Sequence, residues 1–258
     1  MANFVSKYPE FYPIAKRRIA SDLERLAVCK SILLPISGNA LYVGQFNGTY
    51  KGNVAYSIEY SVVLDVIAII SRLYAPVPKS NPPGDDISLN AMAWQFSNND
   101  DFLRMFKSDA RRSGASTQII SSSSDLPSSV VFHMRRKWAR ESEQECVSGI
   151  EKSTRLISKF SKSKLYGIIR SFRSENISHN LESSKDRGRF NISNSDKLNF
   201  DKFLRASNRA LLIGGFAYQV FFRHELALGG WSRYWEQYAK EFWHSAAGLE
   251  PPELQFDD

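Results

Sequence analysis

The sequence predicts an all-α protein, and three patterns favour this fold class. Apolar residues recur every three to four positions along most of the chain, which places them on one side of a helix. The alternating apolar and polar runs of half-buried strands are almost absent. With 258 residues, of which 43% are hydrophobic, the chain can bury a core without metal or disulfide support. We therefore expect one helical-bundle domain over residues 1–258.

The first half of the chain is predicted to form four helices, over residues 14–34, 53–74, 89–96 and 100–111. Pro76 and Pro78 end the second of them, because proline cannot continue the helical hydrogen-bond ladder. Ser88 is a good N-cap for the third. A serine-rich segment at about 113–129 follows the fourth and is expected to be a loop at which the chain folds back.

Four more helices are predicted in the second half, over residues 130–160, 162–180, 200–228 and 232–246. The first of them combines an apolar stripe with a heavily charged outer face. The pair Gly229-Gly230 is expected to separate the last two helices, because glycine disfavours a helix interior.

Cysteine usage and apolar run lengths predict a cytoplasmic protein. Cys29 and Cys146 lie 117 positions apart, which implies neither a disulfide framework nor a zinc cluster. The first residues lack the basic start and unbroken apolar run of a secretory signal. The most apolar stretches, residues 62–70 and 210–222, are shorter than the roughly 20 residues that span a bilayer, so no membrane helix is expected.

The positive charge of the chain is concentrated in its middle. The net charge is 34 − 27 = +7, but residues 104–189 alone hold 18 basic and 9 acidic residues, or +9. Clustered cations favour a partner that carries phosphates; the alternative is a set of solvated helix faces. Candidate phosphate contacts are grouped on the long central helix: Arg135, Arg136, Lys137 and Arg140.

Familiar catalytic motifs are missing from the sequence, which has no phosphate loop, dinucleotide fingerprint, zinc-protease pair or nucleophile elbow. Its histidines are His133, His179, His224 and His244. His179 follows Arg173 by six positions, which on one helix is about 9 Å of rise and roughly 240° of rotation. The two side chains converge poorly within one helix, whereas a twofold axis could bring both pairs of a dimer into one cleft.

Arg173, Ser174 and His179 resemble the motif of the HEPN superfamily (higher eukaryotes and prokaryotes nucleotide-binding), in particular its abortive-infection type. That motif is an arginine, an adjacent polar residue and a histidine after four to six intervening residues, and here five intervene. The resemblance extends over about 54–243: a helix ending at 71–76, a helix start at 88–90 and an aromatic-rich last helix. It departs at Ser174, where the family usually has Asn or Asp.

This resemblance implies a homodimeric helical bundle in which paired motifs line a cleft and cut RNA without a metal or cofactor. Arg173 and His179 are then the expected catalytic residues, since imidazole transfers protons near neutral pH and guanidinium stabilises a phosphorane. Ser174, Asn176 and Asn180 are expected to orient or support them, with Arg170 as a further RNA contact. The alternatives are a solvated Arg170, helix-capping asparagines and an Arg173–His179 pair that only forms interface hydrogen bonds.

Two functions follow from these residues. The first is a metal-independent endoribonuclease of a bacterial defence or toxin–antitoxin system, with RNA and an antitoxin or regulatory protein as partners. The second is a non-catalytic HEPN module that binds nucleic acid, nucleotide or a protein. A purely structural helical adaptor is less favoured, because it leaves the basic segment unexplained.

Overall fold

The computed structural model describes residues 10–36, 42, 45–46, 48–77, 87–116, 128–174 and 200–250. Over these ranges the chain is helical and contains no strand, which confirms the all-α prediction. The helices are α1 (Phe11–Leu33), α3 (Tyr50–Leu73), α4 (Leu89–Asn98), α5 (Asp100–Ser116), α6 (Ser128–Ser161), α7 (Lys164–Arg173), α8 (Phe200–Phe222) and α9 (Leu228–Ala247).

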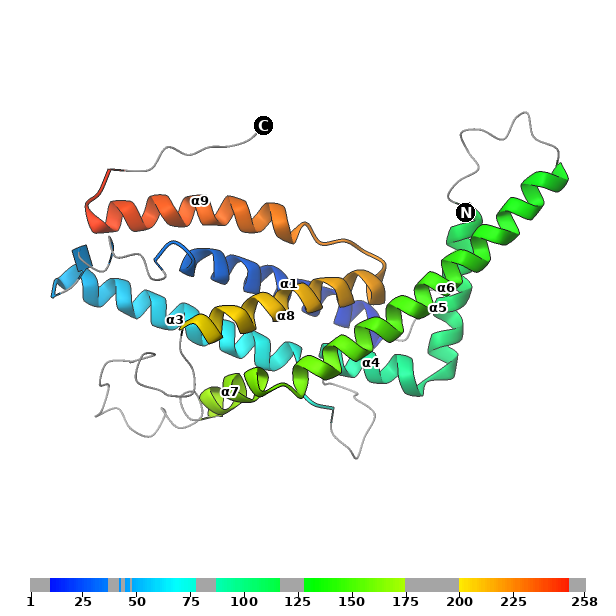
Figure 1. Cartoon of the computed structure of the whole chain (residues 1–258), viewed down its shortest axis with the longest axis horizontal. Helices are drawn as coiled ribbons and strands as arrows, with labels where there is room; N and C mark the ends of the chain where they lie inside the picture. The colour runs from blue at the N-terminus through cyan, green and yellow to red at the C-terminus, as the bar shows by residue number, and fades with distance from the viewer. Residues whose placement is uncertain are drawn as a thin grey trace.

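The helices form a bundle with a projecting arm (Figure 1). In the bundle, α1 packs between α3, α8 and α9, while α7 lies against α3, α6 and α8. The C-terminal half of the long helix α6 packs along α8. Its N-terminal half extends out of the bundle and packs against α5. We define the arm as α5 together with residues 128–148 of α6.

One contiguous core joins the helices of the bundle; α9 reaches it only through Leu228 and packs mainly over a smaller cluster around Trp243. Tyr74 and Phe160 meet near the centre of the large core, with their ring centroids 4.6 Å apart. Asp22 of α1 accepts a 2.9 Å hydrogen bond from Nε of Arg72 of α3, which pairs a largely buried carboxylate with a cation.

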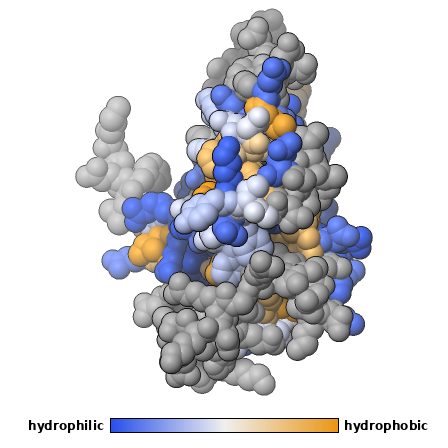
Figure 2. Space-filling view, turned by 90° about the vertical axis from the view of Figure 1, so that its left-hand side faces the viewer, coloured by the Kyte–Doolittle hydropathy of each residue, from blue (hydrophilic) through white to orange (hydrophobic). Residues whose placement is uncertain are grey.

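Helix α3 divides into two unlike halves. Its second half is buried in the core through residues such as Val66, Ile67 and Ile70. Its first half is exposed: Tyr50 is 89% and Val54 54% accessible to solvent. Figure 2 views this end of the molecule and shows apolar residues among hydrophilic ones on its surface. By length and composition α3 alone among the described helices could cross a membrane, a test that buried core helices also pass.

The arm is held together by close helix packing. A Cβ added to Gly114 of α5 would lie 2.7 Å from the carbonyl oxygen of Trp138 of α6, so glycine permits this approach. Arg111 of α5 forms an ion pair with Glu143 of α6. Close backbone packing and a surface ion pair therefore hold α5 and α6 together, in addition to the buried Phe102 and Phe106 near the base of the arm.

Several predicted boundaries were wrong. Ser113 and Ser116 lie in α5, and α6 begins at Ser128, so the serine-rich loop is shorter than predicted at both ends. Gly229 and Gly230 lie inside the first turn of α9. Glycine is tolerated there because the first backbone N–H groups of a helix have no intrahelical partner in any case.

The break between the last two helices lies instead at residues 223–227. Helix α8 ends at Phe222, and Arg223 takes a left-handed conformation with φ of 49°. Helix α7, predicted to run to residue 180, is described as an α-helix to Arg173. Residues 175–180 lie outside the described part of the chain.

Candidate nucleic-acid interface

Helix α7 presents the motif arginine and is fixed to the core through its other side. Tyr166, Ile169 and Phe172 are buried at spacings of three residues. The Tyr166 hydroxyl donates a 2.8 Å hydrogen bond to the carbonyl oxygen of Tyr74, and the Ser163 hydroxyl accepts a hydrogen bond from the Tyr166 N–H as the N-cap. These anchors fix the helix on the core, so the backbone positions of Arg170 and Arg173 at its exposed end are defined.

Arg170 and Arg173 lie one turn apart at the exposed end of α7. Burial raises the pKa of the Tyr166 phenol, and the nearby positive charges of Arg170 and Arg173 act in the opposite direction. Cations at this end of a helix also interact favourably with the helix dipole, which gives both residues a structural role as well.

Ser174 caps the helix, and its backbone N–H donates to the carbonyl oxygens of Arg170 and Ser171. Its exposed side chain has no described partner. His179, Asn176 and Asn180 lie outside the described residues. The predicted convergence of Arg173 and His179 therefore stays a prediction.

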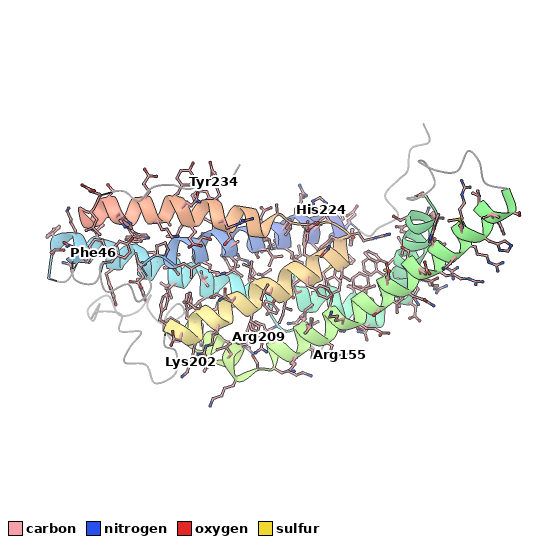
Figure 3. All side chains as sticks on the ribbon, turned by 45° about the horizontal axis from the view of Figure 1, so that its top comes forward. Phe46, Arg155, Lys202, Arg209, His224 and Tyr234 are labelled. Atoms are coloured by element: carbon pink, nitrogen blue, oxygen red, sulfur yellow. The ribbon has the colours of Figure 1, made fainter. Side chains whose placement is uncertain are left out.

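Arg173 belongs to a larger group of cations on the second half of α6, on α7 and on the first half of α8. Residues 149–174 and 200–212 contain ten basic and two acidic residues, so their net charge is 10 − 2 = +8. We call these cations the basic surface: Lys152, Arg155, Lys159, Lys162, Lys164, Arg170, Arg173, Lys202, Arg205 and Arg209. Figure 3 shows Lys202, Arg209 and Arg155 along the same side of the molecule.

Three helices bring the basic surface together. Gly149 of α6 approaches Val220 of α8, and Lys152 lies 5.0 Å from the ring centroid of Phe216, so the two helices run antiparallel. In this register Lys159 is level with Arg209. The start of α8 then lies beside α7, which contacts both α6 and α8.

Within the described ranges, few cations of the basic surface have a carboxylate partner. Apart from Lys202, which has a further interaction, none of them pairs with a carboxylate of the described chain. All of them except the half-buried Lys202 are exposed. Mutual repulsion among unpaired cations is relieved when a polyanion binds and releases its counterions.

The four other predicted phosphate contacts lie on the arm. Arg135, Arg136, Lys137 and Arg140 are all exposed on the first half of α6. Arg136 and Arg155 are 19 residues apart on one helix, or about 28 Å. The structure thus separates the predicted contacts into two places, with Arg170 and Arg173 in the basic surface and the other four on the arm.

The described histidines have roles in packing or lie at the surface. Nδ1 of His244 lies 2.7 Å from the hydroxyl oxygen of Tyr42 and 2.9 Å from the carbonyl oxygen of Lys240. His224 stands edge-on to Tyr218, and His133 is exposed on the arm. Within the described ranges, no three His, Cys, Asp or Glu side chains gather in a way that could hold a metal ion.

Sequence reasoning missed eight members of the basic surface: Lys162 and Lys164 between α6 and the start of α7, and two triplets, Lys152, Arg155 and Lys159 on α6 and Lys202, Arg205 and Arg209 on α8. A signal for the triplets was present, because both have the same spacing of three and four residues. That spacing puts each triplet on one face of its helix. What the spacing could not show is that the two faces become neighbours.

Comparisons with known proteins add no assignment. No family model matches the chain, and neither a curated protein nor a solved structure matches it. The likeness to the HEPN superfamily therefore remains a prediction from the motif and its surroundings.

Proposed function

We propose that the chain binds RNA on the basic surface and cleaves it without a metal, using Arg173 and His179. The observation that carries this proposal is the position of Arg173. The motif arginine is exposed at the end of α7, beside helix segments of net charge +8 whose cations, apart from Lys202, pair with no carboxylate of the described chain. A phosphate held there meets a guanidinium that is able to form two parallel hydrogen bonds.

The chemistry needs only proton transfer and charge stabilisation. The 2′-hydroxyl of the RNA loses its proton to a base, its oxygen bonds to phosphorus, and the bond to the 5′-oxygen breaks as that oxygen gains a proton. His179 serves the proton transfers, and Arg173 stabilises the five-coordinate phosphorane. The products are a 2′,3′-cyclic phosphate and a free 5′-hydroxyl, and DNA is not cut because it lacks the attacking group.

A second function, nucleic-acid binding without cleavage, is favoured by two features of α7. No described side chain forms an ion pair with Arg173, so nothing described orients its guanidinium for catalysis. The position after it holds Ser174, where the resembling family has Asn or Asp. Both features are compatible with a surface that binds phosphates and does no chemistry.

Parallel measurements of binding and cleavage separate the two functions. Purified protein is incubated with a labelled single-stranded RNA in excess EDTA, and the products are resolved on a gel and tested for cyclic-phosphate ends. Cleavage that His179→Ala abolishes supports the ribonuclease. Salt-dependent RNA binding without cleavage supports the binding module, and affinity that does not change with salt contradicts both.

A further inference from the structure

A second surface of the molecule, on α9, is aromatic and exposed. Tyr234, Tyr238 and Phe242 are 48%, 39% and 50% accessible to solvent. Their spacing of four residues aligns them in one stripe along the helix. The opposite side of α9 buries Ala239 and Trp243. The stripe is therefore an outer face that the described chain does not cover.

Two side chains of the stripe contact each other, and the helix behind them is anchored to α1. The Tyr238 hydroxyl donates a 2.8 Å hydrogen bond to the Tyr234 hydroxyl, and the two ring centroids are 4.7 Å apart. Behind them, Nε1 of Trp243 donates a 2.9 Å hydrogen bond to the carbonyl oxygen of Ile32 of α1. Aromatic side chains are enriched at the centres of protein interfaces, so an exposed aromatic stripe on an anchored helix suits a protein partner.

Two opposite charges flank the stripe without meeting each other. Arg233 and Glu241 are eight residues apart on α9, or about 12 Å, so they cannot pair within one chain. Neither forms an ion pair elsewhere in the described chain, whereas their neighbours Lys240 and Glu236 pair with each other. An unpaired cation at one end of an apolar stripe and an unpaired anion at the other suit a partner with the reverse arrangement.

We propose that this partner is a second copy of the chain, which docks α9 antiparallel on α9 about a twofold axis beside Tyr238. Tyr238 then faces Tyr238 of the second copy, and Tyr234 faces its Phe242, since each lies four residues from the axis. Arg233 and Glu241 precede these aromatics by one residue each, so they lie on the same side of the contact. Their positions along the axis differ by about 3 Å, within reach of an ion pair.

The surface continues from α9 onto α3. A groove of about 390 Å³ lies between the two helices, lined by Tyr50, Val54, Ile58 and Phe242 among others. In the antiparallel arrangement Gly230 of the second copy lies opposite Ala246, beside this groove. Gly229 and Gly230 have open space around their Cα atoms, which permits close approach.

This dimer leaves the two basic surfaces apart. Helices α9 and α7 lie on opposite sides of α1 and α3 (Figures 1 and 3), and α9 packs mainly on α1. Docking through α9 therefore does not bring the two basic surfaces together, and Arg173 and His179 of one copy then act without those of the other. The arrangement differs from the shared cleft that the family resemblance implies, and it does not depend on RNA binding.

Charge reversal tests the interface by sedimentation or light scattering at micromolar concentrations. We expect Arg233→Glu and Glu241→Arg each to raise the dimer dissociation constant at least about tenfold, because each places like charges together. An equal mixture of the two variants should dimerise again, since the reversed side chain of each copy then faces an opposite charge on the other. Arg17→Glu and Glu145→Arg, at exposed unpaired positions on α1 and α6, are the matched controls.

The proposal would be overturned by a wild-type chain that stays monomeric at these concentrations, by reversal variants that dimerise as the wild type does, or by a mixture that does not associate. Tyr238→Ala provides a second measurement that involves no charge. It should also weaken the dimer while circular dichroism shows an unchanged helical content, and an unaffected dimer would equally contradict the interface.

Discussion

The basic surface and the arm share the same cation-rich part of the sequence but differ in how their charges are used. The basic surface has ten cations and two acidic residues, or +8. The arm, residues 100–116 and 128–148, has eight cations and six acidic residues, or +2. Four of the eight arm cations are engaged in ion pairs with arm carboxylates. Among the described residues, unpaired positive charge is therefore concentrated on the basic surface, so the number of cations alone does not locate a candidate binding site.

The two regions also differ in how they are anchored. Helix α7 is attached to the core through the buried Tyr166 and Phe172 and through a hydrogen bond to the Tyr74 carbonyl. The outer part of the arm is stabilised by α5 and α6 packing on each other, with ion pairs such as Arg111–Glu143 at the surface. Exposed ion pairs contribute little stability. The basic surface is therefore the more firmly positioned of the two.

The largest expected effect is on cleavage at the edge of the basic surface. Removal of the proton-transfer group by His179→Ala should lower the cleavage rate about 10²- to 10⁴-fold, and Arg173→Ala should lower it about 10²- to 10³-fold. Single-turnover cleavage of a labelled RNA measures both rates. A matched control is Arg136→Ala on the arm, which should cut RNA at nearly the wild-type rate. Equal losses of cleavage rate in all three variants would contradict the assignment of cleavage to the basic surface.

Charge reversal compares RNA affinity at the two places directly. Arg155→Glu combined with Arg209→Glu should weaken binding of a single-stranded RNA about tenfold or more at low salt, because two phosphate contacts become repulsive. Arg135→Glu combined with Arg136→Glu makes the same charge change on the arm and should weaken binding less than about threefold. Fluorescence anisotropy over a range of salt concentrations gives both affinities. A larger loss for the arm variant would reverse our assignment.

The thermal stability of a variant should show how firmly α7 is anchored to the core. Tyr166→Phe removes the hydrogen bond to the Tyr74 carbonyl and should cost about 1 kcal/mol, or about 2–4 °C in Tm. The cost stays modest because Asn90 Nδ2 still donates to that carbonyl at 2.9 Å. Differential scanning calorimetry measures the change. An unchanged Tm would mean that α7 is held by its apolar contacts alone.

The smallest effect is expected at the surface of the arm. Glu143→Gln breaks the ion pair with Arg111 and should lower the free energy of unfolding by less than about 1 kcal/mol, since both partners are reached by solvent. The difference from the wild type should shrink as salt is added. Urea unfolding at low and high ionic strength tests this, and a loss as large as that of Tyr166→Phe would show that the arm is a stronger unit than we infer.

The sequence by itself determined the fold class and the position of most helices. Apolar spacing located the bundle helices, Ser88 marked a helix start, and Pro76 lies just past the end of α3. These features are local, because they depend on a few consecutive residues and on backbone chemistry. The failure at Gly229-Gly230 has a local cause too, since glycine is tolerated in the first turn of a helix and the turn that separates the helices falls at Arg223.

Only the tertiary structure decided which charges act together. Lys159 and Arg209 are 50 positions apart in the sequence, and they come level with each other because α6 and α8 pack antiparallel. Conversely, Arg136 and Arg155 lie on one helix, yet its straight rise separates them by about 28 Å. Charge pairing and charge accumulation depend on distances in space between helices. Composition gives the number of cations and periodicity gives the helix face on which each lies, but helix packing determines which of them form a surface.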